Sequence, residues 1–314
     1  MKVRFWGVRG SLPSPLTPSQ YRSRIAAIIQ RITEEDIGSQ RSRELFLSKL
    51  PGYLKSVTGG NTTCVELSAE SGGSIIFDAG SGIRELSREL VSSGCVKGTF
   101  HIFFTHFHWD HIQGLPFFTP YLFKDDCVFH FYHADGGIRE NLEYQMNTRF
   151  FPVPFPSNEK RIHFHKIPES GVNLGDLHIA YRHMKHPGGS IAYKVKEKNR
   201  SFIFATDTEL AESDFEKTDD NDAFFKDADL MVLDSQYTLD EALDKTDWGH
   251  TSYSLAVDFA LSWDMKKLGL FHHNPNYSDK KLHSVENAAI EYCTRSSGSR
   301  LTVFSAFEGM EVVI

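Results

Sequence analysis

Short apolar runs ended by turn residues recur along most of the chain, and segments with apolar residues spaced three or four apart lie between them. The first pattern is typical of strands when aromatic and β-branched residues are frequent, and the second is typical of amphipathic helices. We expect strands at residues 2–8, 62–67, 74–80, 101–104, 128–132, 162–166, 177–182, 191–195, 201–205, 230–233, 268–271, 301–304 and 310–314. We expect helices at residues 83–92, 138–146, 239–245, 252–262 and 279–294.

Residues 15–58 interrupt this alternation. Two groups of apolar residues at helical spacing follow the turn that ends the first strand. The groups are Tyr21, Ile25, Ile28, Ile29 and Ile32, and then Leu45, Leu47, Leu50 and Leu54. We therefore expect a helical insertion at residues 15–58, between two strands of the main fold.

Both halves of the chain alternate strands with helices, and no internal repeat or low-complexity linker divides them. This pattern suits two sheets packed face to face and covered by helices. We predict an α/β (α+β) fold, a four-layer αββα sandwich, in a single domain of residues 1–314 that carries the insertion. The chain has 314 residues, of which 40% are hydrophobic, so it can bury a large core.

The densest group of chemically active side chains follows the expected strand at residues 101–104. The sequence reads H-x-H-x-D-H and supplies four potential metal ligands within six residues: His106, His108, Asp110 and His111. Imidazole and carboxylate groups are the usual ligands of zinc and similar cations. Because the loop turns at the strand end, we expect His106 and His108 to face one metal ion and Asp110 and His111 to face a second.

Three later strand ends carry side chains of the same kinds. His186 stands in a turn after a strand, Asp207 ends an apolar strand, and His272 and His273 end another. These residues are candidates to complete a metal site built from loops. The four cysteines are widely spaced and form no C-x-x-C pair, which argues against a thiolate metal site and a disulfide framework.

The segment T-H-F-H-W-D-H at residues 105–111 resembles the signature of the metallo-β-lactamase-fold hydrolases, and the later candidates follow in that family's order. The resemblance implies the αββα fold and two divalent metal ions. It assigns His106, His108 and His186 to one ion, Asp110, His111 and His272 to the other, and Asp207 to both. His272 follows the apolar run directly, so we prefer it to His273 as the last ligand.

Asp78, in F-D-A-G-S-G, matches an early aspartate of that family. The resemblance implies that it hydrogen-bonds a ligand histidine or the histidine-rich loop, and so orients ligands without binding metal. The alternative is an aspartate that only forms the turn before the glycine. We expect three catalytic residues, namely Asp78, Asp110 and His250, and the reason for His250 is given next.

Two metal ions generate a bridging hydroxide and stabilise both oxygens of an in-line displacement, so the ligand set predicts a hydrolase. Thioesters, lactams and phosphodiesters are all cleaved on this fold. Phosphodiesters are favoured because no Cys occupies a ligand position, and because D-S-Q-Y at 234–237 and G-H-T-S at 249–252 resemble ribonuclease Z. The resemblance makes His250 the general acid, oriented by Asp234 or Asp247. Alternatively, His250 caps the helix expected at residues 252–262.

The substrate class follows from charge and from one further resemblance. Residues 59–64, G-G-N-T-T-C, are similar to a segment of phosphodiesterases that include phosphoribosyl cyclic phosphodiesterase; Asn61 either reaches the site or only forms a turn. The net charge of −7 argues against a broad nucleic-acid-binding surface, although the insertion is more basic than the whole chain. We predict a phosphodiesterase for a small or cyclic nucleotide-type phosphodiester. The alternatives are a thioesterase or lactonase, an RNA-processing nuclease and a non-enzymatic metal-dependent sensor.

Zinc is our first choice of metal, with manganese and iron as alternatives, because histidine and aspartate suit all three. No apolar run of about 18 residues predicts a membrane span. The scattered cysteines favour free thiols in a reducing cytosol, so we expect a cytoplasmic protein. Many members of the similar families are homodimers, which makes a homodimer a further expectation. The insertion is expected to cover the site, contact a nucleotide or nucleic acid, or form the dimer interface.

Overall fold

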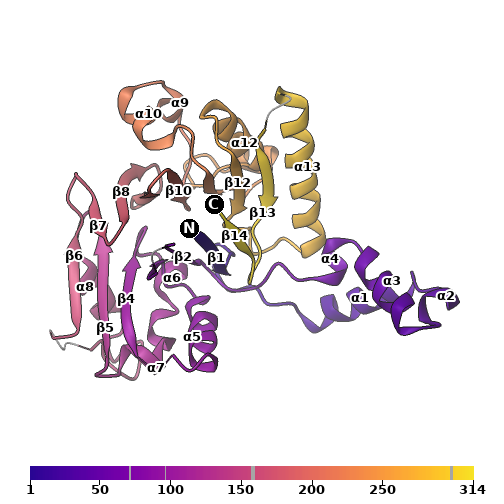
Figure 1. The fold of residues 1–314 in the computed structure, drawn as a ribbon, viewed down its shortest axis with the longest axis horizontal. Helices are drawn as coiled ribbons and strands as arrows, with labels where there is room; N and C mark the ends of the chain where they lie inside the picture. Colours follow the sequence, from indigo (N-terminus) through magenta and orange to yellow (C-terminus); the bar gives the residue numbers. More distant parts are fainter. Residues whose placement is uncertain (71, 96, 157–159, 298–299) are drawn as a thin grey trace.

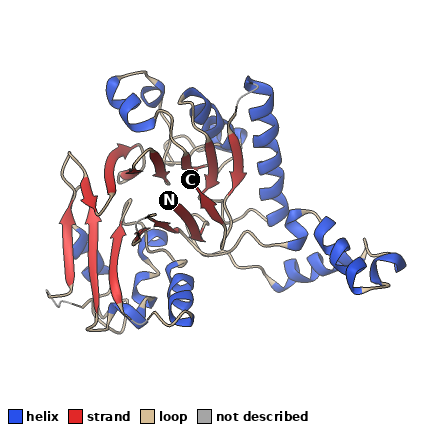
Figure 2. Cartoon of the chain, in the orientation of Figure 1, coloured by secondary structure: helices blue, strands red, loops and turns tan. Residues whose placement is uncertain are grey.

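Two seven-stranded sheets lie face to face in the centre of the molecule, with helices on their outer faces (Figure 1, Figure 2). The computed structural model of the chain describes residues 1–70, 72–95, 97–156, 160–297 and 300–314. This arrangement is the αββα sandwich that the alternation of strands and helices predicted.

Each sheet contains a run of parallel strands, β3 to β6 in the first and β10 to β13 in the second. The first sheet, in the order β14-β1-β2-β3-β4-β5-β6, consists of β1 Lys2–Gly7, β2 Cys64–Ser68, β3 Ser74–Phe77, β4 Gly98–Phe103, β5 Cys127–His133, β6 Ile162–Lys166 and β14 Glu311–Val313. The second, in the order β13-β12-β11-β10-β9-β8-β7, consists of β7 Val172–Leu174, β8 Leu177–Met184, β9 Ser190–Glu197, β10 Arg200–Ala205, β11 Leu230–Asp234, β12 Lys267–Phe271 and β13 Thr302–Ser305. Parallel strands end at the same edge of a sheet, so the loops after them gather there.

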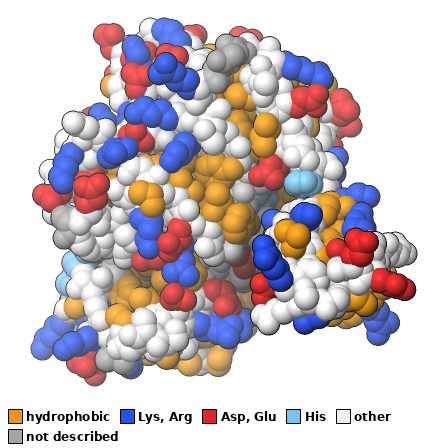
Figure 3. Space-filling view, turned by 45° about the vertical axis from the view of Figure 1, so that its right-hand side comes forward, with side chains coloured by type: hydrophobic (Ala, Val, Ile, Leu, Met, Phe, Trp, Pro, Cys, Tyr) orange, Lys and Arg blue, Asp and Glu red, His pale blue; other side chains and the backbone are white. Residues whose placement is uncertain are grey.

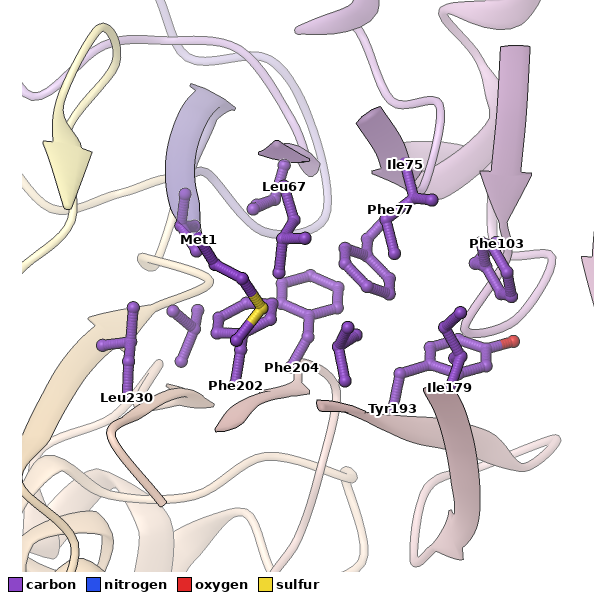
Figure 4. Close-up of a cluster of buried hydrophobic side chains, with 14 of the residues drawn as sticks. Met1, Leu67, Ile75, Phe77, Phe103, Ile179, Tyr193, Phe202, Phe204 and Leu230 are labelled. Carbon is purple, nitrogen blue, oxygen red and sulfur yellow. The ribbon is translucent and has the colours of Figure 1, made fainter. Parts of the chain in front are cut away.

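The inner faces of the two sheets are buried against each other. The ring of Phe77 on β3 has its centroid 5.6 Å from that of Tyr193 on β9 and 5.2 Å from that of Phe204 on β10 (Figure 4). All three side chains are fully buried. Each buried aromatic side chain removes about 150–250 Å² from water, so contacts of this kind are the main force holding the sheets together.

The outer face of each sheet has its own apolar core beneath helices. The first sheet is covered by α5 Ile83–Ser92, α7 Thr119–Leu122 and α8 Ile138–Gln145, and the second by α10 Asp219–Phe225, α12 Tyr253–Ser262 and α13 Asp279–Ser297. The shorter elements are α6 Trp109–Ile112, η1 Leu115–Phe117, α9 Glu212–Phe215 and α11 Leu239–Asp244.

Most elements that the sequence predicted are present, with ends shifted by up to three residues. The prediction missed β7, α6, α7, α9, α10 and η1. All six are short, so too few apolar positions repeat within each of them to reveal a period.

The chain between β1 and β2 forms an arm of four helices where two amphipathic groups were predicted. The helices are α1 Pro18–Ile29, α2 Glu34–Ile37, α3 Gln40–Lys49 and α4 Gly52–Lys55. The arm extends from the side of the molecule beside α13 (Figure 1), where Arg24 forms an ion pair with Asp279.

The apolar residues of the arm are largely exposed. No residue of α1, α2 or α3 is buried, and Tyr21 and Ile29 expose 58% and 61% of their surface. Hydrophobic side chains lie among charged ones on this part of the surface (Figure 3). The helical spacing was therefore read correctly, but the first stripe does not face the core of this chain, and of the second only Leu50 and Leu54 are buried. The treatment of residues 15–58 as an insertion in a single domain stays a prediction.

The described part of the chain holds no helix with both the length and the apolar character needed to cross a membrane. All four cysteines are free thiols. Three of them are buried, and Cys95 is half-buried.

Lys194 on β9 gives a prediction about stability. Its side chain is buried, and its Nζ donates to the carbonyl oxygen of Ala223 at 3.0 Å. Burial lowers its pKa from 10.5 to about 8, so between these values the unfolded chain holds the proton more tightly. The free-energy cost of burying the charged Lys194 side chain is fully present below pH 8 and disappears as the pH rises towards 10.5. We expect Lys194→Met to raise the free energy of unfolding by about 1–3 kcal/mol at pH 7, with a smaller gain at pH 10.

Urea denaturation at the two pH values measures this effect. Lys196→Met is the matched control, because Lys196 lies two residues away on the same strand and is exposed. A Lys194→Met protein that gains nothing at pH 7, or gains equally at pH 10, would contradict the prediction.

Candidate metal centre

The seven predicted ligands lie together where loops from both sheets meet. They follow β4 (His106, His108, Asp110, His111), β8 (His186), β10 (Asp207) and β12 (His272). Strands β8 and β10 run in the same direction because each pairs antiparallel with β9. The loop after β8 therefore reaches the same edge as the loops after the parallel strands.

The backbone is unusual at three of the predicted site residues. Asp78, Asp207 and His272 have φ values of 59°, 50° and 58°, in the left-handed region that residues other than glycine rarely adopt. Each stands one or two residues after the end of β3, β10 or β12. Such conformations are costly and concentrate at functional sites, where a sharp turn directs a side chain.

The ligand atoms form two groups that share one carboxylate. Within each group all atoms lie within 4.8 Å of one another; the groups are His106, His108, His186 and Asp207, and Asp110, His111, His272 and Asp207. Oδ1 of Asp207 lies 3.8 Å from Nε2 of His106 and 3.7 Å from Nε2 of His186. Its Oδ2 lies 3.0 Å from Nε2 of His111 and 3.1 Å from Nε2 of His272. Each oxygen of Asp207 thus faces a different group, as a carboxylate that bridges two ions requires.

Hydrogen bonds on the far side of the rings orient two of these histidines. Nδ1 of His186 donates to the carbonyl oxygen of Gly249 at 2.9 Å, and Nδ1 of His111 donates to Asp78 at 2.8 Å. The proton on Nδ1 leaves Nε2 with a free lone pair that faces the cluster. Gly249 is required here, because its φ is 84° and a Cβ would lie 2.2 Å from the His186 ring.

Two buried ring nitrogens lack a hydrogen-bond partner among the described residues, namely Nε2 of His106 and Nε2 of His111. A buried polar atom without a partner costs about 1–3 kcal/mol. Nε2 of His111 lies 3.2 Å from Asp110 and 3.0 Å from Asp207, yet it forms a hydrogen bond with neither. Imidazole nitrogens that converge with carboxylates are a suitable donor set for divalent cations. These residues therefore fit the two ions that the fold implies.

The electrostatics of the cluster favour the protonation states that metal ligands need. Burial opposes the charge on Asp110 and on Asp207, but His111 lies beside both and holds the pKa of each carboxyl well below its usual range. Burial lowers the pKa of His106 well below its ordinary value, and His111 adds to the effect. Burial also opposes a charge on His111, but Asp207, Asp110 and Asp78 outweigh burial and raise its pKa well above the ordinary value. The site thus combines ionised carboxylates and a neutral His106 with a His111 ring that would give up a proton to a cation.

His250 lies at the margin of the cluster and is paired with Asp234. Its Nδ1 is 2.7 Å from Oδ2 of Asp234, and its ring stacks on that of His272 with centroids 5.0 Å apart. Burial alone would lower its pKa, but Asp234, followed by Asp207 and Asp110, outweighs burial and raises the pKa to about 9. Bound cations would offset the charges of Asp207 and Asp110, whereas the contact with Asp234 would remain.

The sequence left open whether Asp234 or Asp247 orients His250, and whether His250 only caps the following helix. Asp247 is paired with Lys185, at 2.7 Å, and so it is Asp234 that contacts the ring. The cap of α12 is Ser252, whose hydroxyl oxygen accepts from the amide of Leu255, so His250 does not cap this helix. Asp234 and His250 also form a third candidate ligand group with Asp207 and His272.

Two further candidates point elsewhere. Nε2 of His273 is 2.8 Å from the carbonyl oxygen of Ala306, so the structure brings His272 to the cluster and not His273. The amide of Asn61 donates to Glu308 at 3.0 Å and accepts from Ser81 at 3.0 Å. These bonds hold Asn61 in the turn before β2, and its side chain is not directed into the cluster.

Sequence reasoning missed residues that support the site. The amide of Ser11 donates to Oδ2 of Asp110 at 2.8 Å, and the hydroxyl of Thr105 donates to Asp78 at 2.8 Å. The side-chain nitrogen Nε2 of Gln236 lies 3.2 Å from Nδ1 of His272. Thr105 adjoins the ligand motif and was open to inference, but only folding brings residue 11 beside residue 110.

A cavity of about 460 Å³ opens over both ligand groups. Trp109 and Trp248 stand at its rim and expose 83% and 61% of their surface. Asp207, His272 and His250 also line the cavity, so a small molecule in it can contact the ligand groups and the Asp234–His250 pair together.

The sequence is similar to curated ribonucleases Z. It is 24% identical over 259 residues to ribonuclease Z of Prochlorococcus marinus (strain MIT 9301), covering 65% of this chain and 80% of the relative. It is 26% identical over 250 residues to ribonuclease Z of Thermococcus onnurineus (strain NA1), covering 65% and 76%.

Solved structures share the fold across the whole chain. The metallo-beta-lactamase fold protein YhfI from Bacillus subtilis matches with a TM-score of 0.66 at 14% identity, covering 99% of this chain and 98% of that one. The short form of human tRNase Z matches with a TM-score of 0.59 at 18% identity, covering 100% and 99%. A diphosphatase from the PhnP family matches with a TM-score of 0.60 at 15% identity, covering 99% and 96%.

The model of the beta-lactamase superfamily domain matches residues 74–273. This range runs from the start of β3 to two residues after the end of β12 and contains Asp78, the seven predicted ligands and His250. The chain therefore belongs to the beta-lactamase superfamily, among the metal-dependent hydrolases of the metallo-β-lactamase fold.

Proposed function

We propose that the protein is a di-metal phosphodiesterase that hydrolyses a small or cyclic nucleotide-type phosphodiester. The observation that carries this proposal is the Asp234–His250 pair, which lies beside both ligand groups with a 2.7 Å contact between its members. Cleavage of a phosphodiester leaves an oxygen that must take up a proton, and a histidine held by a carboxylate can supply it. A thioesterase has a weaker need for such a group, because a thiolate is a better leaving group than an alkoxide.

Two divalent ions would be held by His106, His108 and His186, by Asp110, His111 and His272, and by Asp207 between them. When bound, such a pair supplies Lewis acidity and an activated water for an in-line displacement. Zinc is our first choice, with manganese and iron as the alternatives.

The remaining roles belong to the protein's own groups. Asp78 accepts from His111 and from Thr105, and so fixes the ring and the loop that carries it. Asp110, whose Oδ2 accepts from the backbone amide of Ser11, would orient the attacking water. His250 holds a proton on Nε2 for the leaving oxygen, and Asp234 fixes its ring from Nδ1.

An RNA-processing nuclease is the second candidate function. It is favoured by the curated relatives, which are ribonucleases Z and align with 65% of this chain. The cleaved bond and the roles of the site residues would be the same, but the substrate would be a structured RNA. Location in the cytoplasm and a homodimeric state stay predictions.

Hydrolysis of bis(p-nitrophenyl) phosphate by the protein loaded with zinc or with manganese tests the proposal. We expect turnover with the wild type and loss of turnover in His106→Ala. His178→Ala is the matched control, because His178 on β8 lies outside both ligand groups and contacts Asn173. A protein that binds two metal ions and does not cleave phosphodiesters would refute it and direct assays to thioesters and lactones. Cleavage of a transfer RNA precursor, but of no small diester, would select the second candidate.

The general acid has a test of its own. We expect His250→Gln to slow the cleavage of diesters with an alkoxide leaving group by about 10²–10⁴-fold, because that oxygen needs a proton as it departs. The loss should be much smaller for a p-nitrophenolate leaving group, which departs without one. Steady-state rates on the two substrates measure this difference. Equal losses on both would show that His250 does not act as the acid.

A further inference from the structure

A second cavity, of about 590 Å³, adjoins the metal centre. It lies between α6, η1, α8 and the loop that follows α8, and we call it the aromatic pocket. Its six aromatic lining residues are Phe107, Trp109, Phe117, Tyr144, Phe150 and Phe151. Volumes of about 300–1,000 Å³ are typical of sites for small ligands.

The aromatic pocket and the cavity over the ligand groups lie side by side. Phe107 and Trp109 line both. Trp109 stands between His108 and Asp110 in the ligand motif, so its backbone belongs to the loop that carries the candidate ligands. A ligand whose phosphate lies at the metal centre can therefore place an attached group in the aromatic pocket.

The aromatic side chains at the rim of the pocket are largely exposed to solvent. Trp109, Tyr144 and Phe150 expose 83%, 69% and 66% of their surface, and Phe117 exposes 56%. Several large aromatic side chains exposed together mark a binding surface more often than single ones do. The rings of Phe117 and Phe151 meet edge to face with centroids 5.7 Å apart, and those of Tyr144 and Phe150 lie 5.8 Å apart. The rings hold one another in place before any ligand binds.

Besides Trp109 and Tyr144, the polar lining residues of the pocket carry amides, and none of the described lining residues is charged. Gln113, Asn141 and Gln145 are the amides. Nε2 of Gln145 donates to the carbonyl oxygen of Ile112 at 2.9 Å, whereas its buried Oε1 has no hydrogen-bond partner among the described residues. Aromatic faces for stacking, together with amides for the edge, are the chemistry by which proteins bind nucleobases.

We propose that the aromatic pocket binds a nucleobase of the substrate, so that the phosphodiester is a nucleotide whose base stacks beside Trp109 while its phosphate lies at the metal centre. This inference rests on the proposed function, and it identifies the part of the substrate that determines specificity. In a nucleotide the sugar separates the base from the phosphate. The two cavities proposed to hold the base and the phosphate are likewise neighbours that share Phe107 and Trp109.

Two substrates with the same leaving group test the proposal, namely methyl p-nitrophenyl phosphate and adenosine 5′-(p-nitrophenyl phosphate). We expect the wild type to prefer the nucleoside ester by about tenfold or more in kcat/KM, mainly through KM, as stacking of one base gives. In Tyr144→Ala/Phe150→Ala this ratio should fall towards one. Both residues are exposed, so the variant is expected to fold. Tyr21→Ala on the arm removes an equally exposed aromatic ring and should keep the ratio.

A binding measurement separates the failure of this proposal from the failure of the proposed function. Calorimetry on the metal-loaded protein should show adenosine 5′-monophosphate binding about tenfold tighter than ribose 5-phosphate. Equal binding, or hydrolysis of both esters without preference, overturns the nucleobase pocket even where phosphodiester cleavage is established. Absence of hydrolysis with the binding preference intact overturns the proposed function alone. A dimer that Tyr144→Ala/Phe150→Ala dissociates would assign the aromatic surface to a second copy of the chain and overturn the proposal.

Discussion

Asp207→Asn is expected to abolish most phosphodiester hydrolysis, with a loss on the order of a hundred- to a thousandfold or more. Asp207 is the only member common to both four-residue groups that make up the proposed di-metal site. Its two oxygens face different groups, with His106 and His186 near Oδ1 and His111 and His272 near Oδ2. An amide has one oxygen and no charge, so it cannot serve both groups. Loss of an ion removes several kcal/mol of transition-state stabilisation, or two or more powers of ten in rate.

Metal content shows whether the loss has this cause. Atomic emission analysis should find about two equivalents in the wild type and no more than one in Asp207→Asn. Asp227→Asn is the matched control, because Asp227 is an exposed aspartate in the same left-handed conformation, with φ 55°. Asparagine tolerates that conformation, so backbone strain does not distinguish the two variants. An Asp207→Asn protein that keeps two ions and stays within tenfold of the wild-type rate would exclude a bridging role.

The sequence predicted the ligand cluster because chemistry and local structure coincide there. Each candidate follows an apolar run, and an apolar run reveals its strand. The loops at the carboxyl ends of parallel strands then meet at one edge, so His106 and Asp207 become neighbours although they lie on different sheets. A pattern that is both local and dense needs no long-range information to be read.

Other features depend on contacts that no local pattern encodes. The choice of His272 over His273 was read from the end of the apolar run, but its geometric basis is the left-handed backbone at His272. The choice of Asp234 over Asp247 depends on Lys185, which pairs with Asp247 from the loop after β8. The first depends on a local backbone conformation and the second on a contact with a distant part of the chain.

The aromatic pocket shows the same limit. Trp109, Tyr144 and Phe150 come from three separate segments, and none of them lies in a pattern that distinguishes it from a core residue. Phe150 stands in an aromatic and proline-rich stretch that predicted only a loop. The functional meaning of these residues appears when α6, α8 and the following loop are brought around one cavity.

Replacing Asp78 should give the second large effect, this time on stability as well as metal binding. The carboxylate is fully buried and accepts three hydrogen bonds, from the amide of Thr105 at 2.7 Å, the hydroxyl of Thr105 at 2.8 Å and Nδ1 of His111 at 2.8 Å. Burial raises the pKa of Asp78, while His111 and Thr105 oppose that rise. Removing the acceptor leaves the donors buried without partners, which costs about 1–3 kcal/mol for each.

We expect both Asp78→Ala and Asp78→Asn to lower the free energy of unfolding by about 3–5 kcal/mol. Asparagine accepts the left-handed φ of 59°, but its NH₂ group would meet a donor from Thr105 or His111. Metal affinity should fall by about 10–100-fold, because the ring of His111 loses the bond that fixes it. Urea denaturation and competition with a chelator measure the two effects separately.

Asp258→Asn, which weakens only the contact with the exposed Tyr292, should change stability by less than about 1 kcal/mol. If Asp78→Asn matched the wild type in both measurements, Asp78 would be only a turn residue, and His111 would owe its orientation to other contacts.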